Sequence, residues 1–436
     1  VHVEGGSIVA VAAHDAAAPG AEVVDAGDAV VMPAVVDTHV HVNEPGRTDW
    51  EGFLTATRAA AAGGAGTIVD MPLNSVPPTT SLHGFEEKRA AARGKCHVDV
   101  GFWGGVVPGN LGDLQPMTEA GVLGFKCFLI ESGVDEFRHV GERELRPAMA
   151  ELAKLRAPLL VHAEVPGPIE AAQAEERVRA AQGRASDPRR YASYLASRPR
   201  AAENDAVALA ARLCRETGAR THIVHHSSSD AVALLRAARG EGLPLSAETC
   251  PHYLRFAAEE VPDGATQFKC APPIRERDNR EALWNALREG VIGMIASDHS
   301  PCAPALKGLE AGAFDAAWGG VAGLQLALPV TWTEASRRGF GLLDLVRWLC
   351  EEPARLAGLS RRKGGLHAGA DADLCIFEPE EQFTVTPELI LHRHKLTPYL
   401  GASLRGAVRT TFVRGLRAYD RDRGFADAPR GQEVAR

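Results

Sequence analysis

Short apolar segments alternate with Ala-rich helical stretches from residue 33 to residue 362. This alternation is typical of parallel strands joined by helices, and eight such units can close into a barrel. The expected strands are residues 35–41, 67–71, 98–102, 124–129, 159–164, 221–225, 245–249 and 292–298. We therefore predict an α/β protein built on a (β/α)₈ TIM-type barrel, in which chemistry takes place where the strands end.

The two ends of the chain have a different texture. Both consist of short strand-like runs, such as residues 372–377, separated by polar turns. We predict that residues 1–32 and 363–436 together form a smaller β-sandwich domain, and that residues 33–362 form the barrel. The polar stretch 166–200 inside the barrel region is expected to lie over the barrel mouth.

Composition excludes several classes of protein. The 436 residues carry a net charge of −8 with both signs mixed, and no Lys/Arg cluster indicates a nucleic-acid partner. No apolar run approaches the roughly 18 residues that a membrane-spanning helix needs. The eight cysteines form no CxxC pair, so we expect reduced thiols and a cytoplasmic location. The sequence opens without Met in a strand-like run, so we expect a further strand or two to precede it.

The first chemical signal is the pair His39 and His41 at the end of the first expected strand. Side chains two residues apart on a strand point to the same side, so both imidazoles face the same space. Two adjacent imidazoles are unfavourable in a hydrophobic core, but they can supply half of the ligands of a metal site. Simple core packing is the alternative. Asp37 is placed to orient one of the rings.

Lys126 lies inside an apolar strand between Phe125 and Cys127. Burial disfavours the cation, so the pKa of this amine should fall. A neutral amine can react with carbon dioxide to give a carbamate whose two oxygens can bridge two metals. Pairing with a barrel carboxylate is the alternative reading for a buried lysine.

Three more candidate ligands, His162, His225 and Asp298, end the fifth, sixth and eighth strands. Together with His39, His41 and Lys126 they converge on one barrel mouth. Imidazole and carboxylate donors suit zinc, with cobalt, manganese and nickel also open. At the sixth strand His222 and His226 are alternatives to His225. We expect His226 to pack against the helical layer and His222 to lie deeper.

This set of residues resembles that of the binuclear amidohydrolases, which include dihydroorotases, hydantoinases and allantoinases, and its motifs are most similar to the allantoinase version. The segments are HVHVNEPGRT (39–48), DMPLNS (70–75), ETCPHYL (248–254), KCAPPIR (269–275), SDHSPC (297–302), AWGGVAGLQ (317–325) and HRHKLTPY (392–399). The resemblance covers nearly the whole chain from about residue 30. It implies two divalent metals bridged by carboxylated Lys126, Asp298 as general base, and a homotetramer.

The same resemblance implies a substrate: allantoin, a neutral hydantoin ring with a ureido arm, opened to allantoate in purine catabolism. Dihydroorotases carry an Arg two positions after the second histidine, where this sequence has Asn43. An amide can donate to and accept from a neutral ureido group, although Asn43 also fits a plain turn. The expected substrate contacts are Asn43, Asn74, Cys270, Ser300, Gly319 and Gly320.

Three alternatives stay open at this point. Cys250 and His252 could bind metal, but a kinked proline loop after the seventh strand is preferred. A hydantoinase or dihydropyrimidinase would apply the same chemistry to another ring. A non-catalytic barrel that serves in assembly is the distant alternative, disfavoured because all six metal-ligand candidates are present.

Overall fold

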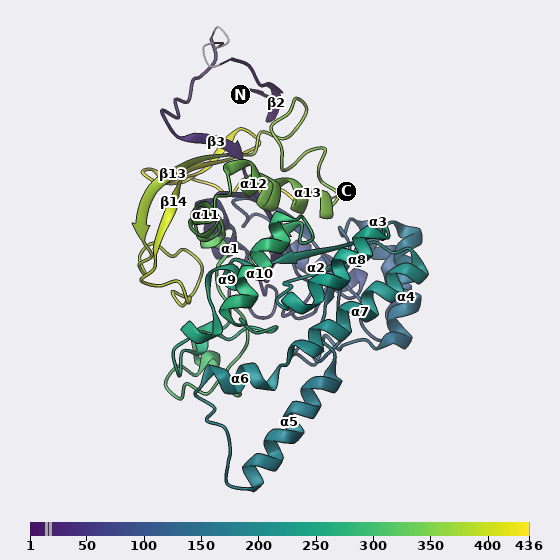
Figure 1. The fold of residues 1–436 in the computed structure, drawn as a ribbon. Coiled ribbons are helices and arrows are strands. Elements are labelled where there is room, and N and C mark those ends of the chain that lie inside the picture. The colour runs from purple at the N-terminus through teal and green to yellow at the C-terminus, as the bar shows by residue number, and fades with distance from the viewer. Residues whose placement is uncertain (14–15, 17–19, 436) are drawn as a thin grey trace.

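The structure, a computed structural model, describes residues 1–13, 16 and 20–435. A helix-covered barrel forms the body of the molecule, and a small antiparallel sheet lies against one end of it (Figure 1). The first and last parts of the chain meet in this small sheet, where β3 (Val30–Pro33) pairs with β13 (Leu374–Thr384). The predicted fold class is confirmed.

The barrel strands are parallel and form two groups that meet at both edges. The strands are β4 (Val35–Val40), β5 (Ala65–Asp70), β6 (Asp99–Phe102), β7 (Gly104–Gly105), β8 (Phe125–Phe128), β9 (Leu159–His162), β10 (Thr221–Ile223), β11 (Leu245–Thr249) and β12 (Met294–Ile295). One group runs β4-β5-β6 and the other runs β7 to β12 in sequence order. Trp103 alone separates β6 from β7, and a bridge between Val40 and His299 joins the last strand to the first.

Amphipathic helices cover the outside of these strands. They are α1 (Phe53–Ala62), α2 (Leu82–Ala92), α3 (Leu114–Ala120), α4 (Glu142–Leu155), α7 (Arg200–Thr217), α8 (Val232–Gly240), α9 (Pro251–Arg255), α10 (Arg277–Arg288), α11 (Ala327–Arg337), α12 (Leu342–Val346) and α13 (Glu352–Leu356). α1 is followed by Gly63 as its C-cap. Between helix and strand, Phe53 and Phe85 both pack edge-on against Phe102. This aromatic packing fixes α1 and α2 against β6.

The small domain contains a five-stranded antiparallel sheet ordered β16-β15-β14-β13-β3. Its remaining strands are β14 (Ser403–Val413), β15 (Leu416–Asp420) and β16 (Gly424–Phe425). A separate hairpin pairs β1 (His2–Glu4) with β2 (Ser7–Ala10), and Ile8 packs on Ala370 and Ala372. The domain boundaries at residues 32 and 363 stay a prediction.

A buried charge cluster joins the barrel to the small domain. The Lys363 ammonium lies 2.6 Å from Asp99, 2.9 Å from Asp371 and 2.6 Å from Asp373. Asp99 begins β6, whereas the other two carboxylates precede β13. The lysine therefore occupies the place where three carboxylates would otherwise repel one another, and it holds the two units together.

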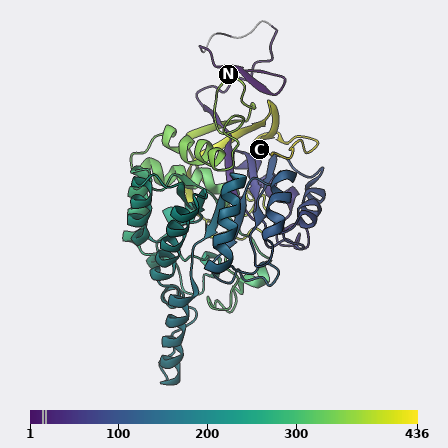
Figure 2. The ribbon, with the colours of Figure 1, turned by 90° about the vertical axis from the view of Figure 1, so that its right-hand side faces the viewer.

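The polar stretch after β9 forms two helices, α5 (Pro166–Ala181) and α6 (Tyr191–Ser197). α5 projects far from the body of the molecule (Figure 2), and Ile169 is its only buried residue. Side chains from both helices line the cavity above the strand ends, as expected for this stretch. Among the described residues, no helix combines the length and the apolar character needed to cross a membrane.

Candidate metal centre

His39 and His41 meet Asp298 where β4 and the strand-8 segment end. The Nε2 atoms of the two rings lie 3.3 Å and 3.8 Å from Oδ1 of Asp298. Ligand atoms around a tetrahedral zinc lie about 3.3 Å apart, because each is about 2.0–2.2 Å from the metal. The three side chains are therefore spaced to share one cation.

His162 and His225 form a second pair beside the first. Nδ1 of His162 faces Nε2 of His225 at 2.9 Å, and the ring planes are close to perpendicular. The His225 and His39 ring centroids are 5.3 Å apart, so the two groups of ligands are neighbours. His226 points the other way, toward Glu203 of α7, as its position on the strand predicts.

Lys126 lies on β8, and its charge is close enough to act on His41 of the first group and on His162 and His225 of the second. Its side chain is fully buried, and its amine is without a hydrogen-bond partner among the described residues. Burial lowers the pKa of Lys126 to about 8, although the charges of Asp298 and Glu248 oppose the shift. The expected alternative, a direct bond to a barrel carboxylate, does not occur in the described part of the chain.

The electrostatics of the centre favour neutral rings over cations. Burial lowers the pKa of His41 and of His225 well below the usual value, and it lowers that of His162 as well. Neighbouring rings and Lys126 add to the effect. Neutral imidazole is the form that binds metal. Buried atoms such as Nε2 of His39 are left without a hydrogen-bond partner, which a bound cation would satisfy. These residues fit a pair of divalent cations.

Glu248 on β11 fixes the orientation of His39. Its carboxylate lies 2.5 Å from Nδ1 of His39 and 3.0 Å from Nε2 of His222. Burial would raise the pKa of Glu248, but the two histidines outweigh it and hold the pKa below the usual range. The ionised carboxylate therefore directs Nε2 of His39 toward the centre, as such carboxylates do for metal-bound histidines.

Glu164 plays the same part for His162. Its Oε2 accepts from Nε2 of His162 at 3.0 Å and from the Arg198 guanidinium at 2.6 Å. Burial opposes ionisation of Glu164, but the nearby Arg198 charge and the His162 contact hold its pKa at about 2. The remaining ring atom, Nδ1, faces the centre.

The sequence suggested that Asp37 orients an imidazole ring. In the structure its carboxylate binds backbone groups instead. Its carboxylate accepts from the backbone N–H of His39 at 3.1 Å and of Ser297 at 3.2 Å. These bonds tie the first strand to the eighth. His39 and Asp298 therefore approach each other because the segments that carry them are held together.

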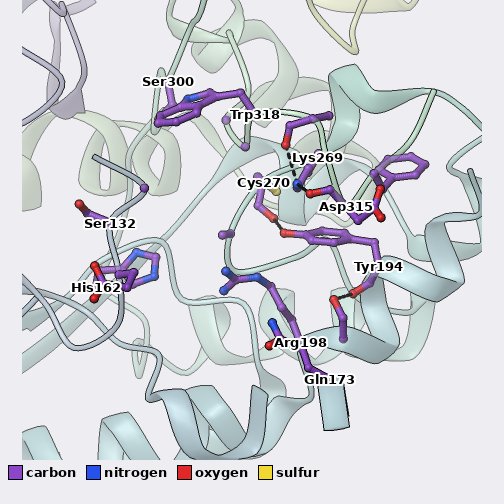
Figure 3. Close-up of a pocket in the computed structure, with 18 of the residues that line it drawn as sticks. Ser132, His162, Gln173, Tyr194, Arg198, Lys269, Cys270, Ser300, Asp315 and Trp318 are labelled. Atoms are coloured by element: carbon purple, nitrogen blue, oxygen red, sulfur yellow. Dashed lines mark hydrogen bonds between the residues drawn. The ribbon is translucent and has the colours of Figure 1, made fainter. Parts of the chain in front are cut away.

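Above these side chains lies a cavity of about 810 Å³ (Figure 3). All six predicted ligands line it, as do the following predicted substrate contacts: Asn74, Cys270, Ser300, Gly319 and Gly320. Asn43 lies behind the wall, because its side chain is fully buried and donates to the Pro301 carbonyl at 3.1 Å. The structure thus favours the alternative for Asn43, a residue of the turn, over a substrate contact.

The sequence of residues 30–417 matches the model of the Amidohydrolase family. The chain belongs to this family. It is 50% identical to the allantoinase of Streptomyces avermitilis, across 100% of this chain and 94% of that protein. It is 46% identical to the allantoinase of Saccharomyces cerevisiae, across 93% of this chain and 86% of that protein. Among solved structures, the L-hydantoinase of Arthrobacter aurescens is similar, with a TM-score of 0.93 and 34% identity, covering 100% of this chain and 95% of that one.

Sequence reasoning placed the donors at the strand ends but missed the carboxylates behind them. Glu164 follows His162 by two residues, and the period of a strand would have placed both on one side. The sequence indicated the role of Glu248 only weakly, through a single acidic residue in the seventh expected strand. Cys250 and His252, the less favoured metal ligands of the sequence analysis, are buried beside Asp298, with ligand atoms within 4.8 Å of one another.

Proposed function

We propose that this chain hydrolyses the ring amide of allantoin and releases allantoate, a step of purine catabolism. The observation that carries this proposal is similarity to allantoinases over nearly the full length of the chain. The donor set at the strand ends and the cavity above it supply a place for the reaction. The substrate is a small molecule, in keeping with the absence of a Lys/Arg cluster in the sequence.

For the metal centre we propose two cations, most suitably zinc, with cobalt, manganese or nickel as substitutes. His39, His41 and Asp298 would hold the first, and His162 and His225 the second. Lys126 would bridge them after its neutral amine has added carbon dioxide, forming an N–C bond and losing a proton. The unpartnered amine and its lowered pKa support this reaction.

Bound cations would supply Lewis acidity toward the ring carbonyl and would lower the pKa of water to about 7. Asp298 accepts the proton that the attacking water loses and delivers it to the ring nitrogen as the C–N bond breaks. The Ser300 hydroxyl donates to Oδ1 of Asp298 at 2.7 Å and fixes the carboxylate. One water is consumed, its hydroxyl passing to the carbonyl carbon and its proton to nitrogen.

Backbone groups around Ser300, Cys270 and Gly319-Gly320 are proposed to bind the ring amides. This wall is rigid, because the buried Lys307 ammonium donates to the carbonyls of Trp318 at 3.0 Å and Gly320 at 2.5 Å. A Cβ on Gly320 would lie 2.2 Å from the Ser300 carbonyl oxygen. Glycine therefore allows the two wall segments to approach each other closely.

The second candidate activity is that of a hydantoinase, favoured by the structural likeness to the Arthrobacter aurescens protein. A panel of allantoin, hydantoin, dihydrouracil and dihydroorotate, followed by ring-opening absorbance, separates the two. We expect the highest kcat/KM with allantoin. A higher value with hydantoin or dihydrouracil would replace the allantoinase proposal with the second one.

We also propose a homotetramer, to be tested by light scattering on the purified holoenzyme. A monomer mass of 46.4 kDa at working concentration would contradict it. The cytoplasmic location stays a prediction, which cell fractionation tests.

A further inference from the structure

Arg198 stands at the end of α6 on the wall of the cavity, opposite the segment that carries Trp318 (Figure 3). Arg198 directly follows α6, whose Tyr191 and Tyr194 lie at helical spacing on one face. Both tyrosines are buried, and the Tyr194 hydroxyl donates to the Cys270 carbonyl at 2.6 Å. The helix that carries Arg198 is thereby fixed to the far wall.

Only part of the Arg198 guanidinium is used within the protein. Nη1 donates to Glu164 at 2.6 Å. Nε and Nη2 have no hydrogen-bond partner among the residues that the structure describes, and 22% of the side chain is exposed. A guanidinium has five N–H donors in a planar fork. Arg198 therefore presents a pre-oriented edge of unused donors to the cavity.

Lys269, another cationic side chain that lines the cavity, is already engaged. The Lys269 ammonium donates to the Ala317 carbonyl at 2.5 Å and to the Asp315 carbonyl at 3.3 Å. It also lies 5.3 Å from the centre of the Tyr194 ring. Arg198 is thus better placed than Lys269 to meet a ligand.

The pairing of Arg198 with Glu164 decides what kind of ligand suits it. The carboxylate balances the guanidinium charge, so the free edge offers hydrogen bonds without a net positive charge. A neutral carbonyl oxygen can accept hydrogen bonds from this edge. An anionic ligand would be repelled by the nearby Glu164 carboxylate. The Glu164 carboxylate contacts both His162 and Arg198. Arg198 is therefore close enough to the metal centre for a substituent of a ring bound there to reach it.

We propose that Arg198 donates hydrogen bonds to the ureido carbonyl of the substrate and makes the enzyme specific for a ring that carries this arm. The inference rests on the proposed function and adds a specificity residue to it. Hydantoin lacks the arm and gains nothing from Arg198. A site that loses such a hydrogen bond discriminates strongly between the two ligands.

Arg198→Lys tests the proposal, because lysine keeps the charge next to Glu164 but loses the planar fork. We expect full metal content and a fall in kcat/KM for allantoin of about 10- to 100-fold, the usual effect of losing a charge-assisted hydrogen bond. The inhibition constant of hydantoin as a competitor should stay unchanged. Arg177→Lys is the matched control, since Arg177 lines the same cavity from α5.

The possible outcomes distinguish failure of the role of Arg198 from failure of the proposed function. Unchanged kcat/KM for allantoin in Arg198→Lys overturns the role of Arg198. Loss of bound metal in this variant also overturns it, because Arg198 would then act through Glu164 on His162. If the wild-type enzyme fails to open allantoin, both this inference and the proposed function fail.

Discussion

Glu248 offers a direct test of how the metal centre is held, because it touches a proposed ligand without being one. Glu248→Gln keeps the shape of the side chain but removes the charge that lies 2.5 Å from His39 and 3.0 Å from His222. A neutral amide no longer enforces the ring state in which Nε2 of His39 faces the centre. Removing such a partner typically weakens metal binding or activity about 10- to 100-fold.

The assay is competition for zinc between the protein and a chromophoric chelator, with kcat measured on metal-saturated enzyme. His222→Gln is the matched control, because it removes the other partner of Glu248 and leaves the contact with His39. We expect the control to lose several-fold less affinity than Glu248→Gln. Equal zinc affinity in Glu248→Gln and wild type would refute the reasoning that this carboxylate orients His39.

Other substitutions probe separate parts of the account. Asp298→Asn should retain most of its metal but lose about 10²- to 10⁴-fold in kcat, since an amide cannot carry the proton; metal analysis beside steady-state kinetics checks this, and an unchanged kcat removes Asp298 from proton transfer. Lys126→Ala should lose metal and activity together and regain part of both with added short carboxylic acids, whereas full activity without them rules out the bridge. Lys363→Met removes an ammonium from three carboxylates, of which Asp99 keeps Arg414, Asp371 keeps Arg362, and Asp373 has no other cationic partner among the described residues. The unpaired Asp373 should lower the free energy of unfolding by about 3–5 kcal/mol. Denaturant unfolding measures it, and a stability equal to wild type would show that the cluster does not join the two units.

Much of the barrel follows from local pattern, because short apolar strands alternate with Ala-rich helices, and some of these helices, such as α1 and α7, end at glycine. The expected strand 245–249 coincides with β11, and the expected strand 35–41 is one residue longer than β4. The last strand shows the limit. The expected strand 292–298 begins with the apolar run 292–296, but regular pairing covers only Met294–Ile295. Asp298 then adopts φ 44, so the chain turns where its side chain enters the centre.

The parts that the sequence did not reveal depend on contacts between distant segments. Glu248 and His39 are 209 residues apart, and no local period relates them. Asn43 shows the converse: its position after His41 suggested a substrate contact, but φ 66 and the bond to Pro301 turn it away from the cavity. The position of Arg198 on the cavity wall depends on how α6 packs over the barrel mouth, and composition alone does not predict this packing.

The central claim is that divalent cations, held by the side chains at the strand ends, make this chain an allantoin-opening enzyme. The most direct test measures metal content and ring opening on the same sample before chelation, after chelation and after zinc is returned. We predict two cations per chain, loss of activity as they are removed, and recovery when they are restored. Undiminished allantoin opening by metal-free protein would contradict the account.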